Sequence, residues 1–253
     1  MSLKRTKLTL MKKSLLILLL ILGAAIPSTA QPPTYDDLLI YYADGDYEKL
    51  LKKAEQYTLN DKTKQDALPF LYLSKANFDM SKDQVWLDKY PKAFADAITF
   101  AGSCIKKDKD GSVQADNIKY FTDLKIALVE DVKNLVSTKA YPKVISAISK
   151  LHKVAKDDVG SYFLKAACQY NTGDKSAGKA TAIDAYARLD KVTTVEGWRP
   201  VDMDMLRIGV IEFCKSQILL NQRQKALDLL GRVKQWFEKD KEFMDYYCET
   251  VGC

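Results

Sequence analysis

The stretch YYADGDYEKLLKKAEQY, residues 41–57, sets the fold of this chain. Its polar segment at residues 43–46 interrupts apolar residues that recur at helical spacing on both sides. Leu50 and Ala54 are four residues apart, so they fall on one face of the second segment. Gly45 permits the positive φ that a tight reversal requires. The stretch therefore predicts a helix, a turn and a second helix that folds back on the first.

The same pattern returns three more times. Apolar segments at residues 124–136, 162–170 and 206–220 each lead into a short polar turn and a second apolar stripe. The turn residues Lys139 and Gly173 are 34 positions apart, a separation typical of two-helix repeats. No segment alternates as a strand would. We therefore predict an all-α protein built from antiparallel helix pairs.

Residues 41–57 resemble the turn and second helix of the tetratricopeptide repeat (TPR) family, and residues 221–227 are similar to it. The resemblance spans residues 35–237. It implies that the helix pairs stack as an irregular TPR-like right-handed array. Leu38 and Val132 stand where the family prefers a small residue, so the resemblance implies irregular stacking.

The family's repeats bind peptides or proteins along the concave face formed by the first helix of each pair. The positions that correspond to this face are Tyr35, Leu39, Tyr42, Lys133, Phe163, Tyr170, Asn171 and Lys215. The alternative is that the aromatic members of this set pack between helices. The resemblance implies a non-enzymatic scaffold or adaptor with a protein or peptide partner, without a metal or a cofactor.

The first thirty residues have the features of a secretory signal peptide. Lys12 and Lys13 precede an apolar core at residues 15–22, and small residues then lead to a cleavage site after Ala30. Residues 31–253 would then form a single TPR-like domain, whether translation begins at Met1 or at Met11. We expect export to the periplasm, with the cell surface or the medium as alternatives, and a role in a secretion, motility or envelope-assembly complex.

The charge of the exported chain gives no support to a role in nucleic-acid binding. The formal charge is +6, of which basic residues of the leader supply +5, so about +1 remains. A nearly neutral surface has no electrostatic attraction for a polyanion. No later segment is apolar and long enough to predict a membrane span.

Several short motifs resemble catalytic or ligand sites, but each lacks a required element. Residues 173–180 have the glycine and lysine spacing of a phosphate-binding loop, with Ala180 where a hydroxyl must ligate magnesium. Residues 176–179 fit SxxK without its companion motifs. Residues 108–111 resemble a calcium loop without its terminal carboxylates. His152 is the only histidine, so we interpret it as solvated or at the edge of the core.

Two alternative functions remain open. An all-helical envelope hydrolase would need converging carboxylates, for which the candidates are Asp123, Glu130 and Asp131. A carbohydrate-binding module of nutrient uptake would need a shared aromatic platform, for which the candidates are Trp86, Tyr90 and Trp198. The segment 190–204 is the longest predicted irregular connection, and we expect Trp198 to anchor it to the body.

The five cysteines are too scattered for a disulfide-dense scaffold. Cys168 and Cys214 lie within apolar helical patterns, which predicts small buried side chains. Cys248 and Cys253 are close enough in sequence to close a small loop in an oxidising compartment.

The leader predicts a mature N-terminus near Gln31 in protein recovered from the envelope or the medium. N-terminal sequencing of the native protein tests this. An intact Met1 or Met11 on a cytosolic protein would contradict it.

Overall fold

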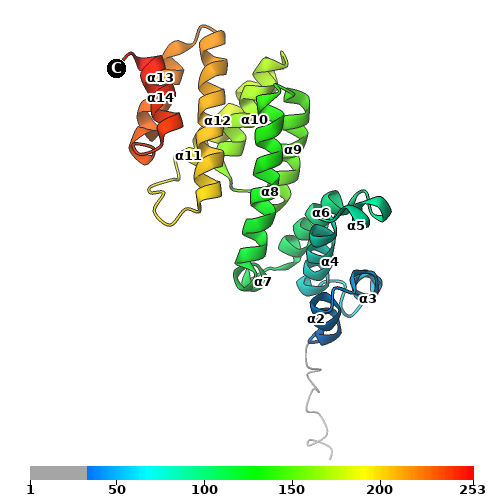
Figure 1. Cartoon of the computed structure of the whole chain (residues 1–253). Coiled ribbons are helices and arrows are strands. Elements are labelled where there is room, and N and C mark those ends of the chain that lie inside the picture. Colours follow the sequence, from blue (N-terminus) through cyan, green and yellow to red (C-terminus); the bar gives the residue numbers. More distant parts are fainter. Residues whose placement is uncertain (1–32) are drawn as a thin grey trace, which may run out of the picture. The chain divides into compact units, whose positions relative to one another are not determined.

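The computed structural model describes residues 33–253, and helices form all of its regular structure (Figure 1). The predicted signal peptide and Gln31 lie outside the described residues. Within residues 33–253 there is no strand, so the predicted all-α class is confirmed. The α-helices are α2 (Asp36–Ala43), α3 (Tyr47–Leu59), α4 (Ala67–Met80), α5 (Gln84–Lys89), α6 (Ala93–Lys107), α7 (Ser112–Asp116), α8 (Ile118–Ser137), α9 (Tyr141–Val154), α10 (Val159–Asn171), α11 (Lys175–Leu189), α12 (Pro200–Leu219), α13 (Arg223–Val233) and α14 (Lys241–Val251), with a 3-10 turn at Lys234–Trp236.

The four predicted turns share one backbone geometry. In the first, the Gly45 N–H donates to the Tyr42 carbonyl and the Asp46 N–H donates to the Tyr41 carbonyl. This pair of bonds is the Schellman motif that ends a helix on a left-handed residue. The same pair of bonds recurs at the other turns, and the left-handed residues are Gly45, Lys139, Gly173 and Asn221, with φ of 70°, 53°, 86° and 57°. The predicted equivalence of these turns is confirmed.

The predicted irregular connection at residues 190–204 is shorter than expected, because α12 begins at Pro200. Proline is favoured in the first helical turn, where its missing N–H costs nothing. The Asp202 carboxylate also accepts from the Arg199 backbone N–H, which completes a capping interaction. The irregular segment is therefore confined to residues 190–199. Trp198 packs against the core of the later helices, as an anchor does.

Three groups of buried apolar residues form the core of residues 35–253. The first group lies between α2, α3 and α4, the second involves α4, α6, α8, α9, α10 and α12, and the third lies among α10 to α14. Helices α10 and α12 contribute to the last two groups on different faces. Leu164 and Cys168 of α10 face one group, whereas Phe163 and Ala167 face the other. These two helices therefore connect the second core group to the third.

Helices α10 and α12 approach so closely that only glycine fits at their contact. A Cβ atom on Gly160 would lie 2.2 Å from the Met205 carbonyl oxygen, and one on Gly209 would lie 1.9 Å from the Gly160 carbonyl oxygen. The obstructing atoms belong to backbone, so no side-chain movement could relieve the contact. Both glycines are placed by packing, since neither has a positive φ.

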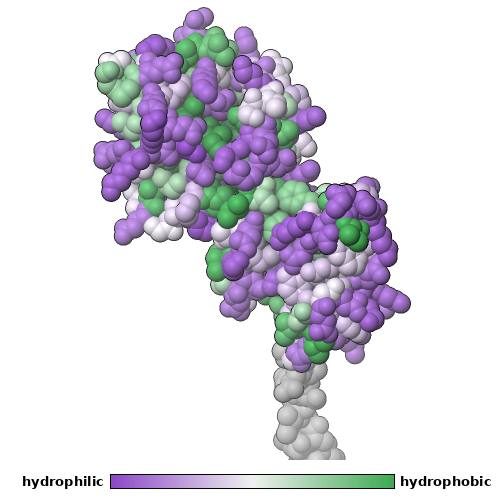
Figure 2. All heavy atoms as spheres, viewed as in Figure 1, coloured by the Kyte–Doolittle hydropathy of each residue, from purple (hydrophilic) through white to green (hydrophobic). Residues whose placement is uncertain are grey.

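The face drawn in Figure 2 is mainly hydrophilic, with separate apolar patches. Large apolar side chains that remain exposed include Leu39 and Ile40 on α2 and Leu219 at the end of α12. Within the described part of the chain, no helix combines the length and apolar character that crossing a membrane requires.

Replacing Gly209 with alanine should lower the free energy of unfolding by about 2 kcal/mol or more, because the added methyl group meets backbone. The matched control is Gly231→Ala in α13, where a Cβ atom would meet nothing within 4 Å. That change should raise stability by about 0.5–1 kcal/mol through helix propensity. Urea denaturation measures both variants, and a stabilised Gly209→Ala protein would contradict the close contact.

Candidate functional site

The structure places two of the predicted partner-binding residues inside the core. Tyr35 and Phe163 are only 5% and 0% exposed. The Tyr35 hydroxyl donates to the Asp66 carboxylate, and the Phe163 ring contacts the rings of Tyr186 and Phe213 at centroid distances of 5.2 and 5.3 Å. Their expected place on the binding face is therefore corrected, because these side chains fill space between helices.

Tyr170 also has a packing role. Its ring lies against Gly178 of α11, where a Cβ atom would come within 2.8 Å of it. The same ring lies 6.3 Å from that of Phe213 in α12. The alternative interpretation, packing between helices, therefore fits Tyr170 better than partner contact. Asn171 is half-buried beside it, and Leu39 is an exposed apolar residue of α2.

Lys133 and Lys215 line one hollow although they are far apart in sequence. Lys133, Val136 and Ser137 come from the C-terminal half of α8, and Ile208, Ile211 and Lys215 come from α12. The hollow has a volume of about 220 Å³, and Arg207, Glu212 and Glu242 also border it. We call it the α8–α12 groove. Its apolar floor and charged rim resemble the division between core and rim in protein interfaces.

The two rim lysines of the α8–α12 groove are paired within their own helices, whereas Arg207 of α12 pairs with Glu242 of α14. Lys133 Nζ lies 2.8 Å from a Glu130 carboxylate oxygen, and Lys215 Nζ lies 2.7 Å from one of Glu212. Such exposed pairs contribute between zero and about 1 kcal/mol. The lysines can therefore exchange these partners for a carboxylate on a bound protein at little cost.

Tyr42 lines a second hollow, of about 400 Å³, between α2, α4 and the start of α8. Its hydroxyl donates to Asp79 at 2.6 Å. The ammonium of Lys75 donates to the Asn117 side-chain oxygen at 2.7 Å, and Tyr120 forms another wall. We call this the Lys75 hollow. Tyr42 and Lys133 therefore belong to two separate hollows in the described residues.

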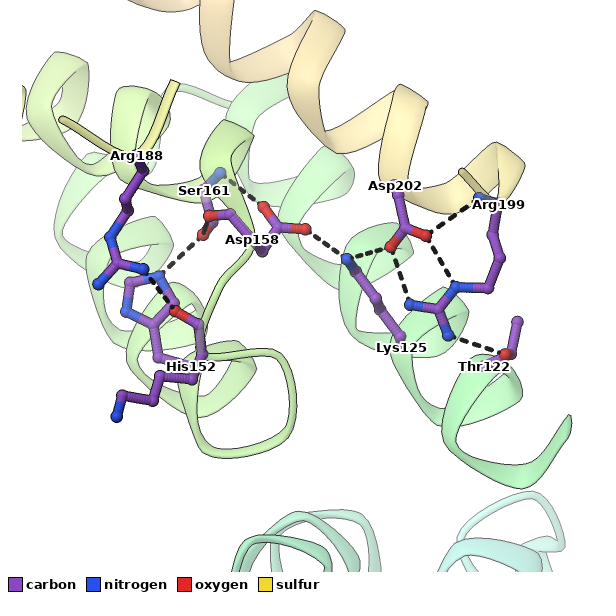
Figure 3. A network of polar contacts seen from close by, with 9 residues as sticks. Thr122, Lys125, His152, Asp158, Ser161, Arg188, Arg199 and Asp202 are labelled. Atoms are coloured by element: carbon purple, nitrogen blue, oxygen red, sulfur yellow. Dashed lines mark hydrogen bonds and ion pairs between the residues drawn. The ribbon is translucent and has the colours of Figure 1, made fainter. Parts of the chain in front are cut away.

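A buried ion network joins α8, α10 and α12 (Figure 3). The ammonium of Lys125, which is 3% exposed, contacts the Asp158 carboxylate and lies 2.6 Å from Asp202. Asp202 also binds the guanidinium of Arg199, which reaches Thr122 of α8. Burial alone would raise the pKa of Asp202, but hydrogen bonds from Arg199 and Lys125 bring it below its ordinary value.

The sequence analysis did not single out Lys125, although a signal was present. Lys125 interrupts the apolar stripe of α8, between the buried residues Phe121 and Leu128. A lysine at a core-facing position needs a buried anion. Neither Asp158 nor Asp202 could be assigned as that anion, because each comes from a helix distant in sequence.

His152, Ser161 and Asp158 lie together but do not form a catalytic triad. His152 Nε2 lies 2.8 Å from the Ser161 hydroxyl, which itself donates to the Asp158 backbone carbonyl. The Asp158 carboxylate accepts from the Ser161 backbone N–H, so it caps α10 and does not orient the imidazole. Ser161 is 0% exposed. In this conformation a substrate has no access to the hydroxyl.

Two of the three candidate carboxylates of α8 form separate surface ion pairs. Asp123 lies 2.8 Å from Lys119, and Glu130 lies 2.8 Å from Lys133. No group of three or more side chains suited to holding a metal ion occurs in residues 33–253. The hydrolase alternative thus gains no support from these residues.

The candidate aromatic residues do not share one platform. Trp86 contacts Tyr90 and Tyr47, at ring distances of 6.0 and 5.7 Å. Trp198 packs instead against the core of α10 to α14. These three residues therefore do not form the aromatic platform that a carbohydrate-binding module would need.

The cysteines divide into buried thiols and a terminal disulfide. Cys104, Cys168 and Cys214 are free and buried, and burial raises the pKa of each thiol to about 12. Thiols of this kind are poor nucleophiles, because the thiolate is the reactive form. Cys248 and Cys253 are joined by a disulfide at the end of α14.

Comparison with known proteins identifies no relative: no family model matches the chain, and neither the curated proteins nor the solved structures include a match.

The partly buried His152 predicts a pH dependence of stability. Burial and, secondly, the charge of Lys165 lower the pKa of His152 to about 4 in the folded protein, against about 6.5 in an unfolded chain. Between these values the unfolded chain binds a proton that the folded protein does not, so stability falls as the pH falls from 6.5 to 4. His152→Gln keeps a side-chain donor and cannot titrate. Melting temperatures measured across this range should therefore fall less steeply for the variant, whereas parallel curves would contradict the shift.

Proposed function

We propose that this protein is a non-enzymatic scaffold that binds a protein or peptide partner in the α8–α12 groove. The observation that carries the proposal is that Lys133 of α8 and Lys215 of α12, which are 82 positions apart in the sequence, border the same apolar floor. Both residues were expected on first helices that face a partner. The proposed arrangement of the helix pairs is an irregular TPR-like right-handed array.

The size of the α8–α12 groove favours a side chain of a protein over a free small molecule. Its volume of about 220 Å³ is below the range of about 300–1,000 Å³ typical of small-molecule sites. Ile208 and Ile211 form an apolar floor, and the rim carries charges of both signs. A partner with one apolar anchor flanked by charged residues would satisfy both features.

The place of action that we propose is the cell envelope. The support is the leader sequence, with its basic residues, apolar core and cleavage site after Ala30. A role within a secretion, motility or envelope-assembly complex is part of the same proposal.

Site-specific photo-crosslinking in the native cell tests the proposal. A crosslinking residue at Ser137, which is exposed and borders the groove, should capture one reproducible partner. The matched control is Ser149 on α9, an exposed helical serine whose hydroxyl also donates to a backbone carbonyl one turn earlier. Equal capture from both positions would contradict a specific groove.

Reversing a rim charge separates binding from folding. Lys215→Glu should weaken capture at Ser137 by roughly fivefold, about 1 kcal/mol, with an unchanged melting temperature, because Lys215 is exposed. The control Lys150→Glu changes an exposed lysine of α9 and should leave capture unchanged. Unchanged capture by Lys215→Glu would exclude the rim from the interface.

A further inference from the structure

We propose that the Lys75 hollow is a second ligand site and that it binds a single carboxylate group. The inference rests on the Lys75 ammonium, which is half-buried on α4 and has no carboxylate within 4.0 Å in residues 33–253. Burying a charge is costly unless it is paired. The fully buried Lys125, by contrast, contacts two carboxylates.

The groups that do surround Lys75 satisfy only part of its charge. An ammonium has three N–H donors, and one of them bonds the uncharged Asn117 oxygen at 2.7 Å. The rings of Tyr42, Tyr72 and Tyr120 have their centroids 5.7–5.8 Å from the nitrogen. These distances lie near the outer limit of about 6 Å for a cation–π attraction. Burial accordingly lowers the pKa of Lys75.

The nearby carboxylates are already committed to other donors. Asp79 accepts from the Tyr42 hydroxyl at 2.6 Å and from Lys82 at 2.9 Å. Asp123 pairs with Lys119 at 2.8 Å. An anion that neutralises the Lys75 ammonium must therefore come from a group other than these carboxylates. The hollow of about 400 Å³ has room for it.

The charge around the hollow favours a carboxylate over a phosphate. Asp79, Asp116 and Asp123 border the same space and balance the charges of Lys75, Lys82 and Lys119, so the lining has no excess positive charge to offset the second negative charge of a phosphate. Lys82 and Lys119 also line the hollow but are paired with Asp79 and Asp123, so the one ammonium without a carboxylate partner among the described lining residues is that of Lys75, which provides little for three phosphate oxygens. The carboxylate could belong to a small organic acid or to an acidic side chain of a protein.

Nuclear magnetic resonance titration of the purified protein tests the site, with the ε-methylene signal of Lys75 as the reporter. The probes are acetate and two end-blocked peptides, Gly-Gly-Glu-Gly-Gly and Gly-Gly-Gln-Gly-Gly. Each is titrated at constant ionic strength against chloride. We expect a saturable shift with acetate, with the glutamate peptide, or with both, and none with the glutamine peptide. Acetate alone would indicate a small acid, and the glutamate peptide alone would indicate a side chain. A saturable shift with neither probe would overturn the proposal.

Two variants and one control connect the shift to Lys75. Binding to Lys75→Met, followed by calorimetry, should be at least about tenfold weaker, while the melting temperature should not fall, since methionine keeps an apolar stem among the rings. Lys49→Met, a lysine of α3 that is paired with Asp46 and lies outside the lining of the hollow, should bind as the unchanged protein does. Asn117→Asp supplies an internal carboxylate to Lys75 and should likewise abolish binding. Full binding by either Lys75→Met or Asn117→Asp would overturn the assignment, and the second variant decides if the first does not fold.

Discussion

The contact between Gly160 and Gly209 is the constraint on which the middle of the structure depends. It brings the backbones of α10 and α12 together with no side chain between them. Both helices carry apolar residues on two faces, so this one pair of helices contributes to two core groups. A larger residue at either glycine would separate the helices and open both groups.

The buried ions around Lys125 fix how α8 meets this glycine contact. Asp158 caps the N-terminus of α10, and Asp202 lies in the first turn of α12, so one ammonium reaches the starts of two helices. Desolvating these charges offsets much of their attraction, so the network is weak evidence for stability. Its consequence is geometric, since any other register of α8 would leave Lys125 buried without an anion.

The two hollows follow from the same placement of α8. Its N-terminal end, with Asn117, helps to line the Lys75 hollow, whereas its C-terminal half, with Lys133, lines the α8–α12 groove. The two differ in their electrostatics. The groove carries lysines that are already paired with carboxylates, whereas the half-buried Lys75 has no carboxylate partner within residues 33–253. The ligands that we propose differ accordingly, a charged protein surface for the α8–α12 groove and a single carboxylate for the Lys75 hollow.

The sequence by itself determined the helical class and the four equivalent turns, because apolar spacing and residues such as Gly45 act through local backbone preferences. It also placed Lys133 and Lys215 on first helices. Only the tertiary structure decided that Phe163 is buried and that Tyr170 packs between helices, while those two lysines share a groove. Helical periodicity gives the apolar face of a helix but not the neighbour that covers it. The pairing of Lys125 with Asp158 and Asp202, and the lack of such a pairing at Lys75 in the part of the chain that the structure describes, depend on helices far apart in sequence, so no local pattern predicts them.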